Sequence, residues 1–169
     1  GGRKFYERRE IRDILAYLRL ILNPADDAAL LRVINVPARG VGVKTLAKLR
    51  EEASNRGEPL LRTARSLGAS AAKGIHAFVQ IVDELTENAT QLQPHELVEL
   101  AIRRSGYKTM LEADRVGDNA ERLTHDARRR LLNLEELIRD ARVNIDDIVG
   151  PDQRTYRPLE RLTAWLDHI

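Results

Sequence analysis

Apolar side chains recur every three or four residues along nearly the whole of this 169-residue chain. Ile11, Leu15 and Leu18 begin the pattern, and it restarts after each Pro or Gly that interrupts it. This spacing places apolar side chains on one face of a helix, whereas a half-buried strand needs strict alternation. No such alternation persists beyond a few residues, and no internal repeat is apparent. The sequence therefore predicts an all-α fold, a compact domain of eight or nine helices.

Proline and glycine mark the boundaries of the expected helices, because Pro removes an amide donor and Gly readily ends a helix. Ser70 is expected as the N-cap of a long helix, residues 114–119 as a loop, and residues 149–158 as an exposed connector. The helices are expected at residues 11–22, 26–37, 43–54, 58–64, 71–85, 94–105, 107–113, 120–141 and 159–169.

The net charge of +2 hides an uneven distribution along the chain. Residues 1–75 hold 15 Lys and Arg against 8 Asp and Glu, a net charge of +7. Residues 76–169 hold 13 against 18, a net charge of −5. A basic half beside an acidic half is typical of a protein with one side facing a polyanion, and ordinary mixing of surface charge explains it equally well.

Several classes of protein are excluded by what the sequence lacks. Without Cys there is no disulfide scaffold and no thiolate metal site, and no apolar run is long enough to cross a membrane. No signal peptide, phosphate loop or dinucleotide-binding glycine motif is present, and the four His are not at metal-ligand spacing. We therefore expect no catalytic residue, no metal site, no cofactor and no membrane partner for this chain, and a cytoplasmic location.

The segment with a recognisable binding chemistry is Gly40-Val41-Gly42, between two expected helices. Two glycines allow a sharp turn and a close approach of the backbone to a ligand, while Val41 is expected to pack between the helices. The next helix would start with free amide groups and its positive dipole end at residues 42–45, an arrangement that binds phosphate without reading a base. The predicted DNA-binding residues are Arg39, Gly40, Val41, Gly42, Lys44 and Thr45, although a two-glycine turn can also be purely structural.

A second segment, residues 66–73, repeats this arrangement in a weaker form. Gly68 follows an apolar residue, Ser70 precedes an expected helix, and Lys73 adds positive charge. A second DNA contact through Gly68, Ser70 and Lys73 is one interpretation, and a simple corner between two helices fits equally well.

The first segment, Gly40-Val41-Gly42 with an apolar helix on each side, resembles the helix-hairpin-helix motif. That motif binds the DNA backbone without sequence specificity.

The first 19 residues carry a narrower resemblance. They are similar to the G-G-x-x-F-[FY]-x-R-x-E-I-[KR]-D-x-L-A-Y-L-R stretch of superfamily 1A DNA helicases of the UvrD/PcrA/Rep type, and the similarity covers essentially the whole chain. It continues in the segments Asn23-Pro24-Ala25-Asp26-Asp27, Leu31–Pro37, Arg39–Gly42, Ser105-Gly106-Tyr107 and Asn133–Leu137.

This resemblance implies the 2B accessory subdomain at residues 19–169, preceded at residues 1–18 by the end of the 2A motor subdomain and a hinge. The parent helicases hydrolyse ATP with Mg²⁺, translocate 3′ to 5′ on single-stranded DNA and act in DNA repair and replication. In them 2B contacts duplex DNA at the Gly-Val-Gly hairpin and swivels as a rigid body to control unwinding. The implied partners are double-stranded DNA at a junction and the motor domains 1A, 1B and 2A, and the chain alone is expected to have no ATPase activity.

Two other readings of the sequence stay open. One is a protein-interaction or autoinhibitory module for repair or transcription proteins, suggested by the acidic second half and by the Arg128-Arg129-Arg130 run. An arginine run of this kind is, however, commonly a solvated helix face with internal ion pairs. The other reading is a free-standing helix-hairpin-helix protein.

Overall fold

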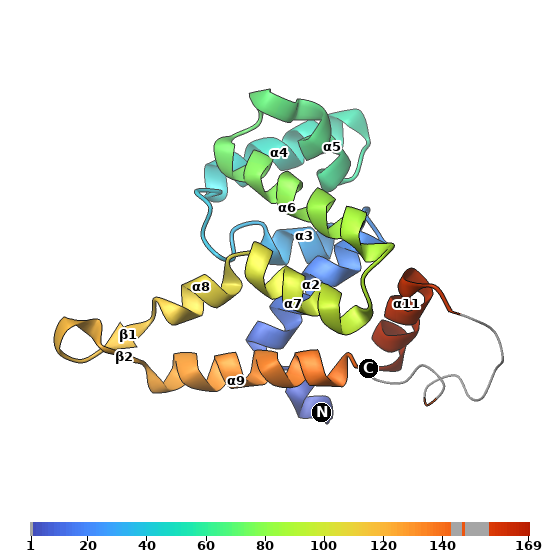
Figure 1. Ribbon diagram of the computed structural model, residues 1–169. Coiled ribbons are helices and arrows are strands. Elements are labelled where there is room, and N and C mark those ends of the chain that lie inside the picture. Colours follow the sequence, from blue (N-terminus) through green and yellow to red (C-terminus); the bar gives the residue numbers. More distant parts are fainter. Residues whose placement is uncertain (1, 143–146, 148–155) are drawn as a thin grey trace.

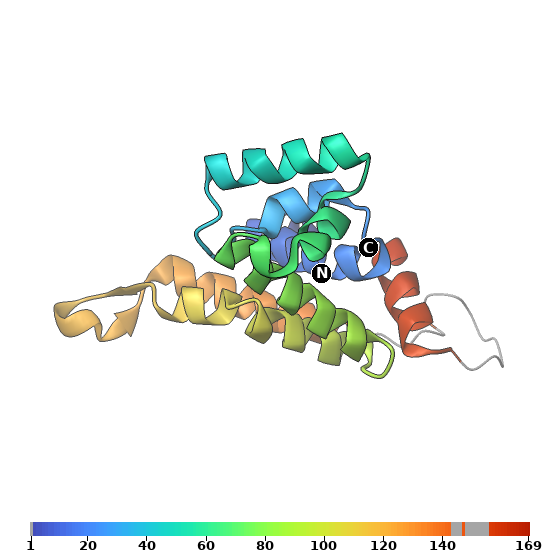
Figure 2. The ribbon, with the colours of Figure 1, turned by 90° about the horizontal axis from the view of Figure 1, so that it is seen from above.

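A computed structural model describes residues 2–142, 147 and 156–169, and it is organised around one central helix, α2 (Arg9–Leu22) (Figures 1 and 2). Ten of the 14 side chains of α2 are buried, and α2 packs against α3, α6, α7 and α9. The remaining α-helices are α1 (Arg3–Tyr6), α3 (Asp27–Val33), α4 (Val43–Arg56), α5 (Leu60–Leu67), α6 (Lys73–Ala89), α7 (Pro94–Arg104), α8 (Tyr107–Glu112), α9 (His125–Asp140) and α11 (Pro158–His168).

The helices lie around α2 in a recognisable order. Helices α4 and α5 and the first turns of α6 form one end of the molecule, and α9 forms the opposite end (Figure 1). Strands β1 (Arg115–Val116) and β2 (Arg122–Leu123) pair antiparallel and project away from the helical body between α8 and α9. Helix α11 packs on α7 at the other side. The expected all-α fold is confirmed, and the described residues contain ten α-helices because α1 adds a short one.

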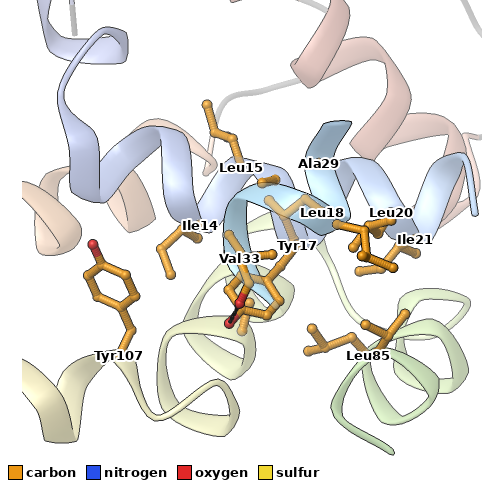
Figure 3. Close-up of a cluster of buried hydrophobic side chains, with 14 of the residues drawn as sticks. Ile14, Leu15, Tyr17, Leu18, Leu20, Ile21, Ala29, Val33, Leu85 and Tyr107 are labelled. Atoms are coloured by element: carbon orange, nitrogen blue, oxygen red, sulfur yellow. Dashed lines mark hydrogen bonds between the residues drawn. The ribbon is translucent and has the colours of Figure 1, made fainter. Parts of the chain in front are cut away.

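The core is a single cluster of apolar side chains with α2 at its centre. Figure 3 shows Ile14, Leu18 and Tyr17 of α2 pointing toward side chains of α3, α6 and α8. Tyr17 and Leu18 are fully buried, as is Leu85 of α6. Burying each large apolar side chain contributes about 1.5–3 kcal/mol, and α2 supplies many of them, so it contributes strongly to holding the helices together.

Helix boundaries follow local signals where the sequence supplies them. Helix α4 ends at a left-handed Gly57, as the Asn55–Gly57 segment predicts. Helix α7 begins at Pro94 with a capping box in which Glu96 accepts from the Gln93 amide, and the left-handed Gly106 follows its end. These boundaries are therefore confirmed.

The structure contradicts the predicted start of α9, the N-cap of α6, the end of α3, and the loop at residues 114–119, which contains β1 and a 3₁₀ turn at Asp118–Ala120. Helix α9 begins at His125 and not at residue 120, because the Thr124 hydroxyl accepts from the Ala127 amide and residues 122–123 pair with β1. Ser70 is not the N-cap of α6; it closes a 3₁₀ turn and its hydroxyl donates to the Leu67 carbonyl. Helix α3 ends at Val33, before Pro37. The connector expected at residues 149–158 lies mostly outside the described residues.

Residues 1–18 do not form a separate layer in this fold. The expected boundary between residues 18 and 19 falls within α2, and Phe5 of α1 is 6% exposed. The Tyr6 hydroxyl donates to the Asp140 carboxylate at the end of α9. This hydrogen bond joins α1, near the start of the chain, to the last residue of α9. The assignment of these residues to a motor subdomain stays a prediction.

No helix among the described residues combines the length and the apolar character needed to cross a membrane.

Candidate nucleic-acid interface

The turn between α3 and α4 is shaped by one left-handed glycine and one asparagine. Gly40 has φ +75°, a conformation that costs little only for Gly. The Asn35 side-chain oxygen accepts from the amide of Arg39 at 2.7 Å and from the amide of Val41 at 3.1 Å. These two hydrogen bonds close the loop around Gly40 and fix where α4 begins.

Val41 anchors this turn to the body of the protein. Val41 is buried, with 3% of its surface exposed, although the helix it lies against is α6 and the sequence analysis expects it between the two helices beside the turn. It lies against Gly74 in the first turn of α6, where an added Cβ would lie 2.9 Å from Val41 Cγ2 and 2.0 Å from the Arg39 carbonyl oxygen. Because Gly74 has no side chain, the backbone of the turn rests directly on α6.

This contact brings the two segments singled out in the sequence to the same part of the molecule. The turn at residues 39–41 lies on the beginning of α6, and α4 and α6 both start in this region (Figures 1 and 2). Lys73 is the first residue of α6 and is exposed, whereas Gly68 ends α5 with φ +52°. Ser70 is exposed, but its hydroxyl hydrogen is donated to Leu67.

The N-terminus of α4 has the chemistry of an anion site. Its N-cap is Gly42, no side chain caps it, and the first turn contains no acidic residue. Gly42, Val43 and Lys44 are exposed, and Thr45 is partly buried. A helix N-terminus carries roughly half a positive charge on its free amide groups, and the Lys44 ammonium adds to it. Gly40, Val41, Gly42, Lys44 and Thr45 thus lie together as expected, with Val41 supporting the turn from inside.

Arg39 does not lie where the sequence analysis expects it. Its guanidinium turns inward and donates to the carbonyls of Val33 and Ile34, to the Tyr17 hydroxyl and to the Ser105 carbonyl. The guanidinium is thus already bonded to four protein oxygens, and a contact between Arg39 and DNA stays a prediction. The last carbonyls of a helix have no partner in the next turn of that helix, and here Arg39 donates to those of Val33 and Ile34, the first of which also accepts from the Val36 amide.

A buried polar network joins α2 to α8 and α9. Tyr107 donates to the Asp13 carboxylate at 2.6 Å and accepts from Arg130 at 2.9 Å, while Asn133 donates to Glu10 at 3.1 Å. Arg32 pairs with the other oxygen of Asp13 at 2.8 Å. Burial raises the pKa of Tyr107 above its ordinary value, and its hydrogen bond to Asp13 raises it further.

A pocket of about 570 Å³ opens between this network and the turn. Pro37, Ala38 and Met110 form its apolar side, and Arg32 and Asp13 lie on its polar side as an ion pair. Its buried carboxylate is already bonded to Tyr107 and Arg32, so no group here is placed as a general acid or base with a free partner. Among the described residues, no group of three or more His, Asp and Glu could hold a metal ion.

The run at residues 128–130 does not form one exposed basic patch. Arg130 is 8% exposed and belongs to the buried network, and Arg129 pairs with Asp126 at 2.5 Å. This pairing lowers the pKa of the Asp126 carboxyl. Only Arg128 of the three faces solvent without such a contact, so the run gives little support to a protein-interaction surface.

Sequence reasoning missed Asn35, Gly74 and Tyr17 as residues that shape the interface. Asn35 follows α3, where a side-chain amide commonly bonds nearby backbone, and this was an available signal. Gly74 inside a helical pattern is also a signal, because such a glycine usually has a packing reason. Tyr17 gives no local sign of its bond to Arg39, because the two residues are 22 positions apart.

Comparison with known proteins identifies the family of this chain. The family described as the UvrD-like helicase C-terminal domain matches residues 1–162. The chain is 40% identical over 144 residues to the ATP-dependent DNA helicase PcrA of Leuconostoc citreum, covering 82% of this chain and 18% of that protein. It is 36% identical to PcrA of Bacillus subtilis (strain 168) over 143 residues and to DNA helicase II of Escherichia coli (strain K12) over 144 residues, covering 82% of this chain and 18% and 19% of those proteins. It therefore spans less than a fifth of the length of these relatives, and on the match over nearly all of its residues the chain belongs to the UvrD-like helicase C-terminal domain family.

Proposed function

We propose that this chain is the 2B accessory subdomain, with the adjoining end of 2A, of an ATP-dependent 3′ to 5′ DNA helicase, and that it binds the backbone of duplex DNA. Membership of the helicase family supports the setting, and the relatives are named as DNA helicases. The observation that carries the DNA-binding part is the exposed N-terminus of α4, which no side chain caps and which lies beside exposed Lys44. Such a site binds phosphate oxygen and reads no base.

The neighbouring start of α6 supports a second phosphate contact. Its N-cap is Ala72, no side chain caps it, and Lys73 is exposed at its first position. Because residues 39–41 rest on Gly74, the two helix N-termini are held in one fixed arrangement. We assign the second contact to Lys73 and the α6 amide groups, since the Ser70 hydroxyl hydrogen already bonds to Leu67.

In the full-length helicase the motor domains 1A and 2A would bind ATP and Mg²⁺, and this subdomain would swivel against them to control unwinding. The duplex would lie against α4 and α6 ahead of the motor. Few phosphate contacts give weak, salt-sensitive affinity, on the order of 10⁻⁴–10⁻⁶ M at physiological salt.

The substitution Gly42→Asp tests the proposed contact directly. Gly42 has φ −83°, and an added Cβ would meet nothing within 4 Å, so the substitution fits without strain. Asp is also a favourable N-cap, so we expect α4 to be stabilised by a few tenths of a kcal/mol. The carboxylate would occupy the phosphate position, so we expect duplex binding, measured by fluorescence anisotropy, to be abolished while the melting temperature holds or rises.

The matched control is Gly42→Ser, which caps α4 with a neutral hydroxyl at the same position. We expect Gly42→Ser to keep a substantial part of the duplex affinity. Unchanged binding by Gly42→Asp would show that DNA does not contact this turn.

A further inference from the structure

The side chain of Arg39 connects the turn to four other parts of the fold. One terminal nitrogen donates to the Val33 carbonyl at 2.8 Å and to the Ile34 carbonyl at 3.0 Å at the end of α3. The other donates to the Tyr17 hydroxyl of α2 at 2.6 Å and to the Ser105 carbonyl between α7 and α8 at 2.8 Å. The guanidinium also lies 5.4 Å from the ring centre of Phe78 in α6.

These contacts leave Arg39 little capacity to bind a phosphate. A guanidinium has five N–H donors in one plane, and the four terminal ones have these four oxygen acceptors. The two-pronged contact that Arg usually makes to phosphate needs two free donors on one edge. Withdrawing the group toward a phosphate would also remove the Arg39 donor from the carbonyls of Ile34, just after α3, and of Ser105, between α7 and α8.

The main chain of Arg39 is fixed as closely as its side chain. Its amide donates to Asn35 at 2.7 Å, and its carbonyl oxygen lies where a Cβ on Gly74 would be only 2.0 Å away. The following residue is Gly40, where the chain turns toward α4. The position of Arg39 therefore determines where the N-terminus of α4 lies relative to α6.

We propose that Arg39 is a positioning residue for DNA binding: its inward guanidinium holds the Gly40–Thr45 turn in register with α6 and the core and does not itself contact DNA. This inference rests on the proposed function, because it concerns how the same turn is presented to the duplex. It predicts a residue whose loss weakens DNA binding without removing a phosphate contact.

The test compares Arg39→Lys and Arg39→Met by anisotropy on a labelled duplex across a series of salt concentrations, well below each melting temperature. Lys keeps the positive charge but cannot donate to all four oxygen acceptors of the Arg39 guanidinium. We therefore expect both variants to lose about tenfold or more in duplex affinity. The slope of log affinity against log salt should stay as in the unmodified chain. Lys44→Ala, which removes a direct phosphate contact, should lower that slope by about one.

Arg139→Ala is the matched control for loss of positive charge, since Arg139 is exposed near the end of α9, at the opposite end of the molecule from α4 (Figure 1). It should leave affinity nearly unchanged. Normal binding by Arg39→Lys together with a reduced salt slope in Arg39→Met would overturn the inference, because it would identify a direct phosphate contact. Unaltered affinity of the folded fraction of both variants would overturn it as well, by leaving only a role in stability.

Tyr17→Phe keeps the inference testable if the Arg39 variants do not fold. Tyr17 is fully buried and cannot reach DNA, while its hydroxyl accepts from Arg39 and donates to the Val36 carbonyl at 2.8 Å. We expect about threefold weaker duplex binding at an unchanged salt slope. Unchanged affinity would contradict the positioning role. Failure of the proposed function would give a different result: Gly42→Asp and Lys44→Ala would then bind the duplex as the unmodified chain does.

Discussion

Single uncharged side chains decide the shape of the turn between α3 and α4. One side-chain oxygen of Asn35 accepts from the amides of Arg39 and Val41, and the buried Val41 side chain packs the turn against α6. The sequence predicts the sharp turn at Gly40 from the backbone freedom of glycine, and the burial of Val41 from its apolar side chain. It does not predict the direction of Arg39, because the acceptors from Tyr17 and Ser105 reach it only through tertiary packing.

Replacing Asn35 with Ala should loosen the turn. Two amide groups would lose their acceptor, so we expect the free energy of unfolding to fall by about 1–3 kcal/mol, together with weaker duplex binding. Chemical denaturation measures the first effect and anisotropy the second. Asn55→Ala, at an exposed position in the last turn of α4, is the control and should change stability by no more than about 0.5 kcal/mol. Equal effects of the two substitutions would argue against the role given to Asn35.

At the scale of helices, the sequence predicts which helices exist and in what order better than it predicts the residues at which each helix begins and ends. The 3.6-residue period identifies the buried faces of α2, α6 and α7, and Pro and Gly place several of their ends. The start of α9 is missed because residues 120–124 are held by pairing: the Thr124 amide donates to the Asp114 carbonyl, and its hydroxyl donates to the Asp114 carboxylate. Such contacts, made between the two ends of the segment that joins α8 to α9, produce no repeating pattern of apolar residues from which they could be predicted.

The contact between the turn and α6 can be tested from the side of α6. Gly74→Val puts a branched side chain where even a Cβ would lie 2.0 Å from the Arg39 carbonyl, so the turn must move away from the helix. We expect a loss of about 1–3 kcal/mol in stability from overpacking, with a larger relative loss of duplex affinity. Gln80→Val, at an exposed position of the same helix, measures the effect of a branched residue alone. If both variants bind DNA equally well, the register between α4 and α6 does not matter for binding.

Over the whole molecule, three tyrosines join distant parts of the fold. Tyr6 links α1 to the end of α9, Tyr17 links α2 to the turn, and Tyr107 links α8 to α2 and α9. Burial raises the pKa of all three, and hydrogen bonds to Asp140 and Asp13 raise those of Tyr6 and Tyr107 further. The charge distribution also gains an explanation at this scale, because the proposed DNA contacts all lie in the basic half, residues 1–75.

These raised pKa values predict a cooperative alkaline transition. A group whose pKa is higher in the folded state contributes stability below its unfolded value, about 10 for Tyr, and that contribution is lost as the pH rises above it. We therefore expect tyrosinate absorbance to appear together with the loss of helical circular dichroism. In denaturant the same tyrosines should ionise near their ordinary pKa. Ionisation of these tyrosines at about pH 10 with helicity intact would contradict the burial and bonding described for them.

The buried network around α2 has a consequence for how the chain is made. Glu10 and Asp13 leave the ribosome before their partners: Asn133, which bonds to Glu10, is synthesised 123 residues later, and Tyr107, which bonds to Asp13, 94 residues later. Arg32 can already pair with Asp13 at that stage, but burying both carboxylates before α8 and α9 are made would leave their charge less fully compensated than in the complete fold. We therefore expect the central helix to reach its final environment only once α8 and α9 have left the exit tunnel.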